Sequence, residues 1–381
     1  MFLSLKEVYF MLIERAIISG GGTGGHIFPA LAIADEIKSR NPSASILFVG
    51  ASGKMEMEKV PQAGYEIVGL KIAGLQRKFS FSNFLLPFKI LGSLLKARKI
   101  LIHFKPQIVV GVGGYASGPT LMMANFLRIP TVIQEQNSFP GKTNRILAKK
   151  AACICTAYEG MERFFPNSKV VLTGNPIRKE FSANLKSKAQ SCSFFGLDPE
   201  KPTILVMGGS LGAKTLNISV QKNLEEIMNS GVQIIWQCGK LYHSQLLIDL
   251  KEKELKNICL HQFIDRMDLA YSAADLIISR AGAISVSELC FVGKPLILVP
   301  SPNVSEDHQT KNANALVAKK AAILITDSEA PDSLFKIALD LLKNKEKCEL
   351  LSLEIKKIQK LNATANIVDA FENILTDNGT K

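Results

Sequence analysis

The sequence predicts an α/β protein built from two doubly wound parallel sheets. Short apolar runs alternate with helical stretches along the chain, which is typical of parallel sheets covered by helices. Three glycine-rich segments, at residues 20–25, 111–114 and 208–212, each stand where an apolar run ends and a helical pattern begins. A length of 381 residues, 47% of them hydrophobic, is sufficient for two buried cores of ordinary size.

Six apolar runs predict the strands of the first sheet. They cover residues 16–19, 45–49, 108–110, 130–133, 154–156 and 170–172. Between the first two runs, residues from Pro29 to Arg40 place their apolar side chains at helical spacing, so a helix is expected there.

The pattern restarts beyond the turn at Asn175-Pro176-Ile177-Arg178, with runs at 203–207, 233–236, 276–278, 295–299 and 322–325. The hinge is placed at this turn because a polar, Ser/Lys-rich stretch follows it. We therefore expect an N-terminal domain over 1–177 and a C-terminal domain over 178–354. A last helical stretch, from about Ser352 to Leu375, is expected to pack back on the first domain, which would then include residues 355–381.

The net charge of +12 indicates an anionic partner, which could be a nucleic acid, a phosphorylated metabolite or an acidic membrane surface. No apolar run approaches the roughly 20 residues that cross a bilayer. The first 13 residues lack the features of a signal peptide. Seven scattered cysteines without CxxC spacing fit a reducing cytosol.

The first glycine segment fits a phosphate, because glycines let backbone N–H groups face a ligand at the start of a helix. Gly20, Gly22 and Gly25 also match the G-x-G-x-x-G dinucleotide pattern. A nicotinamide site would need an acidic residue after the second strand, where the chain reads Gly50-Ala51-Ser52. The missing acid disfavours a dehydrogenase.

His26 directly follows the first glycine segment and should lie in the first turn of a helix. The positive end of the helix dipole there disfavours the imidazolium form, which leaves a neutral ring able to accept a proton. His26 is therefore a candidate general base, and the alternative is a histidine that only orders the glycines.

Three further polar segments are candidates for ligand contacts. In the segment Arg280–Glu288, small residues open a helix, and Glu288 offers two oxygens to a ribose; alternatively, it is a first-turn acid that stabilises its own helix. Residues 306–312 carry side chains suited to a sugar, or form a solvated loop. Glu135-Gln136-Asn137 follow a strand, where they either contact substrate or form a turn before Pro140.

Residues 75–104 mix aromatic and aliphatic side chains with lysines and arginines, which indicates an element that binds a membrane surface. The aromatic candidates are Phe79, Phe81, Phe84 and Phe88. The alternative is an amphipathic core helix with a solvated basic face. Nucleic acid is disfavoured, because no nucleic-acid-binding motif accompanies the charge.

Taken together, these motifs closely resemble the MurG family of lipid II-forming N-acetylglucosaminyltransferases. The motifs are residues 20–30, 103–106, 113–119, 135–137, 174–178, 208–213 and 280–288, so the similarity covers nearly the whole chain from about Ala16. The resemblance implies the GT-B fold, with two Rossmann-like domains facing a central cleft. It also implies an inverting transfer of N-acetylglucosamine from UDP to the C4 hydroxyl of the muramyl sugar of lipid I, an undecaprenyl-diphosphate-linked MurNAc-pentapeptide. The resemblance further implies that the protein is peripheral at the cytoplasmic face of the inner membrane, with an anionic membrane surface as a partner.

The resemblance also implies roles for individual residues. His26 would be the base. The positions that match the family's donor site are Thr23, Gly24, Gly25, Asn137, Arg178, Ser210, Ile264, Ala283, Ile284, Ser285, Val286, Ser287, Glu288 and Gln309. Gly113, Gly114, Tyr115 and Glu135 would contact the acceptor. No Asp-x-Asp motif is present, so catalysis without a metal or other cofactor is expected.

Three other functions remain open at this stage. A UDP-sugar epimerase would share the nucleotide loops but would not need the basic apolar segment. An NAD-dependent oxidoreductase lacks its ribose-binding acid. A non-catalytic membrane adaptor would account for Phe79–Phe88 but not for Glu288 or the three glycine segments.

Overall fold

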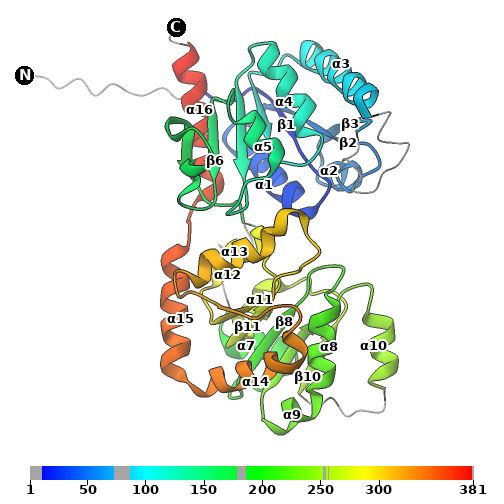
Figure 1. Ribbon diagram of the computed structural model, residues 1–381, viewed down its shortest axis with the longest axis vertical. Coiled ribbons are helices and arrows are strands. Elements are labelled where there is room, and N and C mark those ends of the chain that lie inside the picture. Colours follow the sequence, from blue (N-terminus) through cyan, green and yellow to red (C-terminus); the bar gives the residue numbers. More distant parts are fainter. Residues whose placement is uncertain (1–10, 73–85, 178–185, 252–254, 256, 380–381) are drawn as a thin grey trace, which may run out of the picture. The chain divides into compact units, whose positions relative to one another are not determined.

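The computed structural model describes residues 11–72, 86–177, 186–251, 255 and 257–379 (Figure 1). The chain forms two compact units, here called the N-terminal unit (residues 1–177 and 360–381) and the C-terminal unit (residues 178–359). Each unit contains one fully parallel sheet. No helix in the described ranges is both long and apolar enough to cross a bilayer.

The N-terminal unit is built on a seven-stranded parallel sheet in the order β3-β2-β1-β4-β5-β6-β7. Its strands are β1 (Arg15–Ser19), β2 (Ser45–Ala51), β3 (Glu66–Leu70), β4 (Ile108–Gly111), β5 (Thr131–Glu135), β6 (Cys153–Thr156) and β7 (Val170–Leu172). The order reverses between β1 and β4. This pair is therefore the switch point of the sheet, where ligands of doubly wound folds bind.

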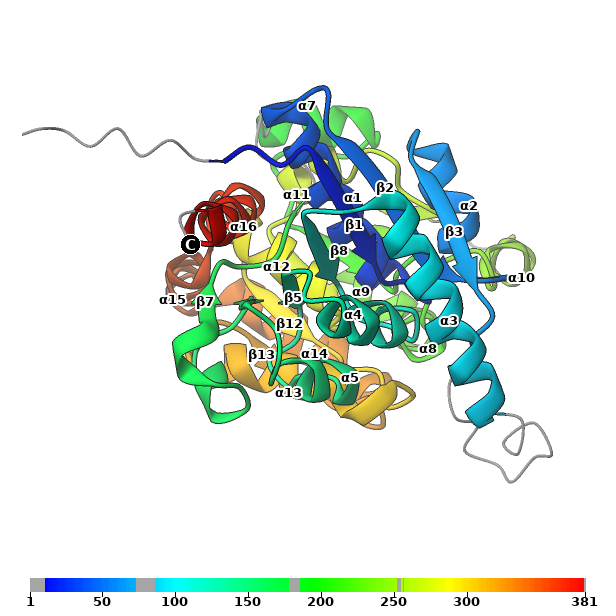
Figure 2. The same ribbon diagram turned by 90° about the horizontal axis from the view of Figure 1, so that it is seen from above.

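Helices cover both faces of this sheet. They are α1 (Gly24–Arg40), α2 (Glu56–Gln62), α3 (Leu86–Phe104), α4 (Ser117–Phe126), α5 (Lys142–Leu147) and α16 (Ala363–Gly379), with short 3-10 turns at Met161–Arg163 and Asn167–Lys169. One core joins α1 and α16 to the sheet, and a second core packs α3, α4 and α5 on the opposite face. Figure 2 shows α3 lying alongside α4.

The C-terminal unit repeats this plan with a six-stranded parallel sheet in the order β10-β9-β8-β11-β12-β13. The strands are β8 (Thr203–Met207), β9 (Gln233–Gln237), β10 (Ile258–His261), β11 (Leu276–Ser279), β12 (Leu296–Leu298) and β13 (Ile323–Leu324). The helices are α7 (Lys188–Phe194), α8 (Lys214–Lys222), α9 (Leu224–Asn229), α10 (His243–Asp249), α11 (Met267–Ala273), α12 (Ala283–Val292), α13 (His308–Val317), α14 (Ala330–Lys343) and α15 (Lys345–Ile358). The switch point here lies between β8 and β11.

The predicted fold class is confirmed, but three elements differ from expectation. β3 and β10 were not predicted; each is a short edge strand that is only partly buried. The single helix expected from Ser352 to Leu375 was wrong. The chain forms α15 and α16, separated at residues 359–362, where Asn362 adopts a left-handed φ of 58°.

The last helix belongs to the N-terminal unit. Arg40, near the end of α1, donates to Asp369 at 2.6 Å, to Glu372 at 2.8 Å and to the backbone oxygen of Ala365 at 3.0 Å. Glu372 is buried. These three acceptors hold α16 against α1.

Candidate active site

The first two glycine segments meet at the switch point of the N-terminal unit. Residues 20–23 connect β1 to α1, and residues 112–116 connect β4 to α4, so both follow carboxyl ends of neighbouring strands. The backbone N–H of Gly21 donates to the oxygen of Gly113 at 3.3 Å. The two segments therefore form one continuous surface of backbone groups.

This close approach requires glycine at two positions of the second segment. A Cβ on Gly114 would lie 2.4 Å from the backbone oxygen of Gly21, and a Cβ on Gly113 would lie 2.8 Å from Cε1 of His26. Both residues also have positive φ, 96° at Gly113 and 87° at Gly114. A side chain at either position would separate the two loops or displace the histidine.

His26 lies in the first turn of α1, and a glutamine orients its ring. Nδ1 of His26 is 3.1 Å from Oε1 of Gln136, which follows β5. The amide nitrogen of Gln136 donates to the backbone oxygen of Val112 at 2.8 Å, so its oxygen faces the ring as an acceptor. In its neutral form, the ring therefore carries its proton on Nδ1, which leaves on Nε2 the lone pair that a general base needs.

A buried carboxylate accepts hydrogen bonds from the first glycine segment and from the end of β2. Glu56, at the start of α2, is 1% exposed. Its Oε2 accepts from the backbone N–H of Gly22 at 2.8 Å, and its Oε1 accepts from that of Ala51 at 2.9 Å. Glu56 was not predicted from the sequence, because nothing in its local pattern indicates that its side chain reaches a loop 34 residues earlier.

Glu135 is the last residue of β5 and is buried. Its carboxylate accepts from the backbone N–H groups of Asn137 at 3.0 Å and Gly141 at 3.2 Å, and from the side-chain amide of Asn144 at 2.8 Å. These bonds hold the turn that presents Asn137, which is half-buried. Asn137 also donates to Glu135 through its side chain, so the turn chemistry considered for this segment is present.

In the C-terminal unit, the third glycine segment and the start of α12 follow the carboxyl ends of β8 and β11. Ser210 is exposed, and Ala283, Ile284, Ser285 and Ser287 are half-buried, whereas Val286 is buried. No side chain caps the N-terminus of α12, where Gly282 precedes the helix. This terminus suits an anion, because its first N–H groups have no partners within the helix.

Glu288 lies in the second turn of α12, so its reading as a first-turn acid was wrong. It is 4% exposed, and Oε2 accepts from the hydroxyl of Tyr271 at 3.3 Å. Arg280, which precedes this helix, donates to the backbone oxygens of Val299 and Pro300 and pairs with Asp327. Arg280 thus ties the loops after β11 and β12 together.

Gln309 and Ile264 also take part in the loops of this edge. The side-chain oxygen of Gln309 accepts from the backbone N–H of Ser301 at 2.9 Å and of Ala281 at 3.2 Å. Ile264 donates its own backbone N–H to Gln237 at 3.0 Å. Residues 308–317 form α13, in which Asn312 is fully buried, so the solvated-loop interpretation of residues 306–312 was wrong.

Several predicted site residues fall outside the structural description. Arg178, Phe79, Phe81 and Phe84 lie outside the described residues, and Phe88 is described only as part of the backbone of α3. Farther along α3, Ser93, Ala97 and Leu101 face the unit. Leu91, Leu95 and Ile102 are 55%, 60% and 46% exposed, and are here called the α3 stripe.

Within the described ranges, no three His, Cys, Asp or Glu side chains come together in a way that could hold a metal ion. The N-terminal unit offers an imidazole and buried carboxylates at the carboxyl edge of its sheet, and the C-terminal unit offers the uncapped start of α12 at the carboxyl edge of its own.

Two Rossmann-like domains with such loops are the architecture of the GT-B fold, and two family models identify the chain as a glycosyltransferase. The model of the glycosyltransferase family 28 N-terminal domain matches residues 16–156, and that of the family 28 C-terminal domain matches residues 203–370. Relatives named as UDP-N-acetylglucosamine–N-acetylmuramyl-(pentapeptide) pyrophosphoryl-undecaprenol N-acetylglucosamine transferases match closely. The relative from Parabacteroides distasonis is 54% identical over 95% of this chain and 98% of its own length. The relative from Flavobacterium psychrophilum is 56% identical over 93% of this chain and 96% of its own.

Solved structures agree with this similarity. The MurG of Acinetobacter baumannii superposes with a TM-score of 0.74 at 29% identity, covering 94% of this chain and 99% of that one. A UDP-N-acetylglucosamine 2-epimerase from Listeria monocytogenes shares only the fold, with a TM-score of 0.66 at 14% identity. The chain belongs to the MurG family of N-acetylglucosamine transferases. The epimerase, oxidoreductase and adaptor hypotheses are thereby set aside.

Proposed function

We propose that this glycosyltransferase moves N-acetylglucosamine from UDP to the C4 hydroxyl of MurNAc in undecaprenyl-diphosphate-linked MurNAc-pentapeptide. The product would be lipid II, the disaccharide precursor of peptidoglycan. The observation that carries the proposal is an identity of 51–56% to relatives of that name over at least 90% of the chain. The glycine segments support it, because each follows the carboxyl end of a strand, where doubly wound folds bind their ligands.

The nucleotide of the donor is assigned to the C-terminal unit. Ser210 and the first turn of α12, residues Ala283–Ser287, would meet its phosphates with N–H groups, a hydroxyl and the positive end of the helix dipole. Glu288 is assigned to the ribose hydroxyls. Gln309 and Ile264 are assigned to donor binding, because their hydrogen bonds hold loops at this edge of the sheet. Arg178, Asn137, Thr23, Gly24 and Gly25 complete the assigned set.

The chemical step needs a base on the acceptor hydroxyl and stabilisation of the departing UDP. We assign the base to Nε2 of His26, because Gln136 holds the ring proton on Nδ1. Inversion at the anomeric carbon follows from one in-line displacement, in which the hydroxyl oxygen bonds to that carbon as the bond to the diphosphate breaks. The diphosphate charge is assigned to Arg178, Ser210 and backbone N–H groups, without a metal.

The acceptor is assigned to the second glycine segment. Tyr115 is 55% exposed beside Gly113 and Gly114, so its ring and the neighbouring backbone can meet a diphosphate or a sugar. Glu135 is assigned an indirect role in acceptor binding, because both of its carboxylate oxygens already accept hydrogen bonds within its own loop.

The protein would act as a peripheral protein at the cytoplasmic face of the inner membrane. The α3 stripe supports this proposal, because exposed leucine and isoleucine side chains alternate there with the exposed Lys99 and Arg98. Apolar side chains can enter the interface while the cations meet anionic head groups. Phe79, Phe81, Phe84 and Phe88 are also assigned a role in membrane binding.

The test is incubation with labelled UDP-N-acetylglucosamine and a short-chain lipid I analogue in the presence of EDTA. Disaccharide product is expected. Absence of product with and without EDTA would contradict the proposed reaction, whereas product that disappears only with EDTA would contradict the metal-free mechanism alone.

A further inference from the structure

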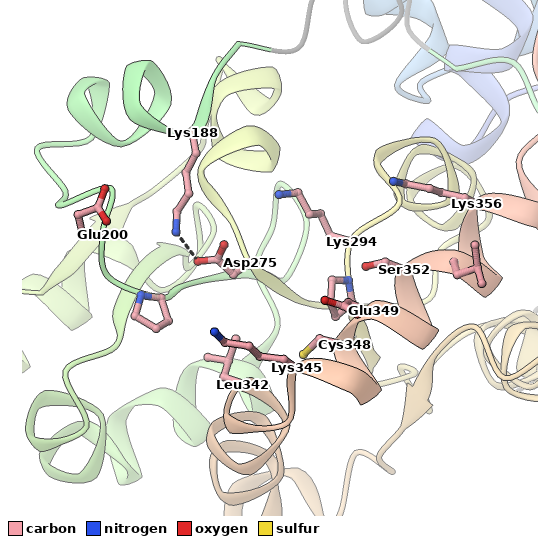
Figure 3. Close-up of a pocket in the computed structure, with 13 residues that line it drawn as sticks. Lys188, Glu200, Asp275, Lys294, Leu342, Lys345, Cys348, Glu349, Ser352 and Lys356 are labelled. Carbon is pink, nitrogen blue, oxygen red and sulfur yellow. Dashed lines mark hydrogen bonds and ion pairs between the residues drawn. The ribbon is translucent and has the colours of Figure 1, made fainter.

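The C-terminal unit contains a cavity of about 570 Å³ at the edge of its sheet opposite to the glycine segment (Figure 3). Pro202, Asp275 and Pro295 line it, and each immediately precedes a strand, β8, β11 or β12. The candidate donor residues instead follow the carboxyl ends of β8 and β11. With strands of four or five residues at about 3.3 Å per residue, roughly 15 Å of sheet separates the two places.

Four lysines line this cavity: Lys188 from α7, Lys294 from the turn before β12, and Lys345 and Lys356 from α15. In Figure 3, the side chains of Lys188, Lys294 and Lys345 surround Asp275. The carboxylate of Asp275 is already engaged, because Oδ2 accepts from Nζ of Lys188 at 2.8 Å and from the backbone N–H of Thr203 at 2.9 Å.

Lys294 is the unusual member of this set. Its ammonium has no hydrogen-bond or ion-pair partner in the part of the chain that the structure describes. Burial lowers its pKa, although Asp275 acts in the opposite direction. An unpaired ammonium in a half-buried position costs stability, and charges in such places are normally paired. A methionine would fill the same space without this cost.

The rest of the lining does not neutralise the lysines. Glu200 and Glu349 lie at the exposed rim and form no described ion pair with Lys294, Lys345 or Lys356. Leu342, Leu353 and Pro295 give the cavity an apolar wall. The cavity thus combines cationic donors without protein acceptors and a surface for a non-polar group.

We propose that this cavity binds a phosphate-bearing ligand, with Lys294 as its innermost contact and Lys345 and Lys356 at its mouth. Ammonium groups donate to phosphate oxygens from several directions, and the apolar wall accommodates the part of the ligand next to the phosphate. The phosphate could belong to a soluble phosphate ester or to the head group of an anionic phospholipid. This site is independent of the proposed transferase reaction.

The test compares Lys294→Met with the unaltered protein by calorimetric titration with inorganic pyrophosphate. Pyrophosphate that binds at the glycine segments contributes equally to both proteins, because the substitution lies at the other edge of the sheet. We expect Lys294→Met to remove the binding that the cavity provides, with affinity reduced at least about tenfold. Lys336→Met, at an exposed lysine of α14, is the matched control and should bind like the unaltered protein.

Thermal unfolding without ligand separates a binding role from a structural one. Lys294→Met is expected to unfold at the same temperature as the unaltered protein or higher, because it removes an unpaired, half-buried charge. Equal pyrophosphate affinity in the two proteins overturns the proposal. If Lys294→Met loses affinity and also unfolds at a lower temperature, the variant Lys345→Met/Lys356→Met decides. The proposal is then overturned if this second variant has normal stability and binds pyrophosphate with normal affinity. Glycerol 3-phosphate and phosphatidylglycerol vesicles, compared in the same pair, then identify the source of the phosphate.

Discussion

Nδ1 of His26 lies 3.1 Å from Oε1 of Gln136, and the amide nitrogen of Gln136 donates to the backbone oxygen of Val112. The same nitrogen also donates to the carbonyl and side-chain oxygens of Gln134. These acceptors fix which end of the amide faces the imidazole. The glutamine therefore determines the tautomer of the histidine, although it lies 110 positions away in the chain.

Replacing His26 with alanine should lower kcat by about 10²–10⁴-fold, the usual contribution of a general base. Gln136→Leu should cause a smaller loss of kcat with little change in the KM for the donor, because the ring stays in place but its tautomer is no longer held. Steady-state kinetics at several pH values measure both effects. The control is Gln62→Leu, at an exposed position of α2. Unchanged turnover in His26→Ala would rule out the assigned base.

The carboxylate of Glu56 should be needed for the shape of the first glycine segment. Glu56→Ala leaves the N–H groups of Gly22 and Ala51 without their acceptor, and hydrogen bonds to charged groups contribute about 1.5–3 kcal/mol each. The expected loss in the free energy of unfolding is at least about 2 kcal/mol, measured by urea denaturation. Glu58→Ala, on the same helix but exposed, should change it by less than about 0.5 kcal/mol. Similar values for the two variants would contradict the role of Glu56.

The sequence predicts those features that depend on residues close to one another in the chain. The glycine segments, the strands before them and the place of His26 in the first turn of α1 all follow from residues within about ten positions of one another. The partners of His26 and of Gly22 depend instead on which strands become neighbours. Gln136 reaches His26 only because β4 and β5 are adjacent in the sheet, and Glu56 reaches Gly22 through the short helix after β2.

The same reasoning explains the errors at the edges of the sheets and at the C-terminus. β3 and β10 are edge strands with apolar runs of only two and three residues, Ile67-Val68 and Ile258–Leu260, and their pairing with β2 and β9 is what identifies them as strands. The break between α15 and α16 depends on a left-handed Asn362, and helical periodicity on both sides conceals it.

Arg40 should control how firmly α16 is attached to the N-terminal unit. Arg40→Met removes charge-assisted bonds to Asp369 and Glu372, and leaves the buried carboxylate of Glu372 without its partner. We expect faster amide hydrogen exchange across residues 363–379 and a loss of about 1–3 kcal/mol in the free energy of unfolding. Arg128→Met, at an exposed turn, is the control. Unaltered exchange in α16 would contradict this role.

His261 should make the stability of the C-terminal unit depend on pH. Burial lowers the pKa of His261, and a nearby His243 lowers it further, while Nε2 has no hydrogen-bond partner among the described residues. Below roughly pH 6.5 the unfolded chain therefore takes up a proton that the folded chain resists, so the free energy of unfolding falls as the pH falls. His261→Phe should reduce this dependence, measured by urea denaturation between pH 7.5 and about pH 5. His103→Phe, at an exposed histidine, should retain it.

The α3 stripe should determine binding to anionic membranes. Leu91 and Leu95 are one helical turn apart on the exposed side of α3, and the buried Ala97 and Leu101 show that the opposite side already covers the core. Leu91→Ser/Leu95→Ser should therefore leave the unfolding temperature nearly unchanged but reduce flotation with phosphatidylglycerol vesicles several-fold, because each serine removes apolar area from the interface. Leu247→Ser/Ile248→Ser, an equally exposed pair on α10, should float like the unaltered protein. If both pairs float equally well, membrane binding does not depend on α3.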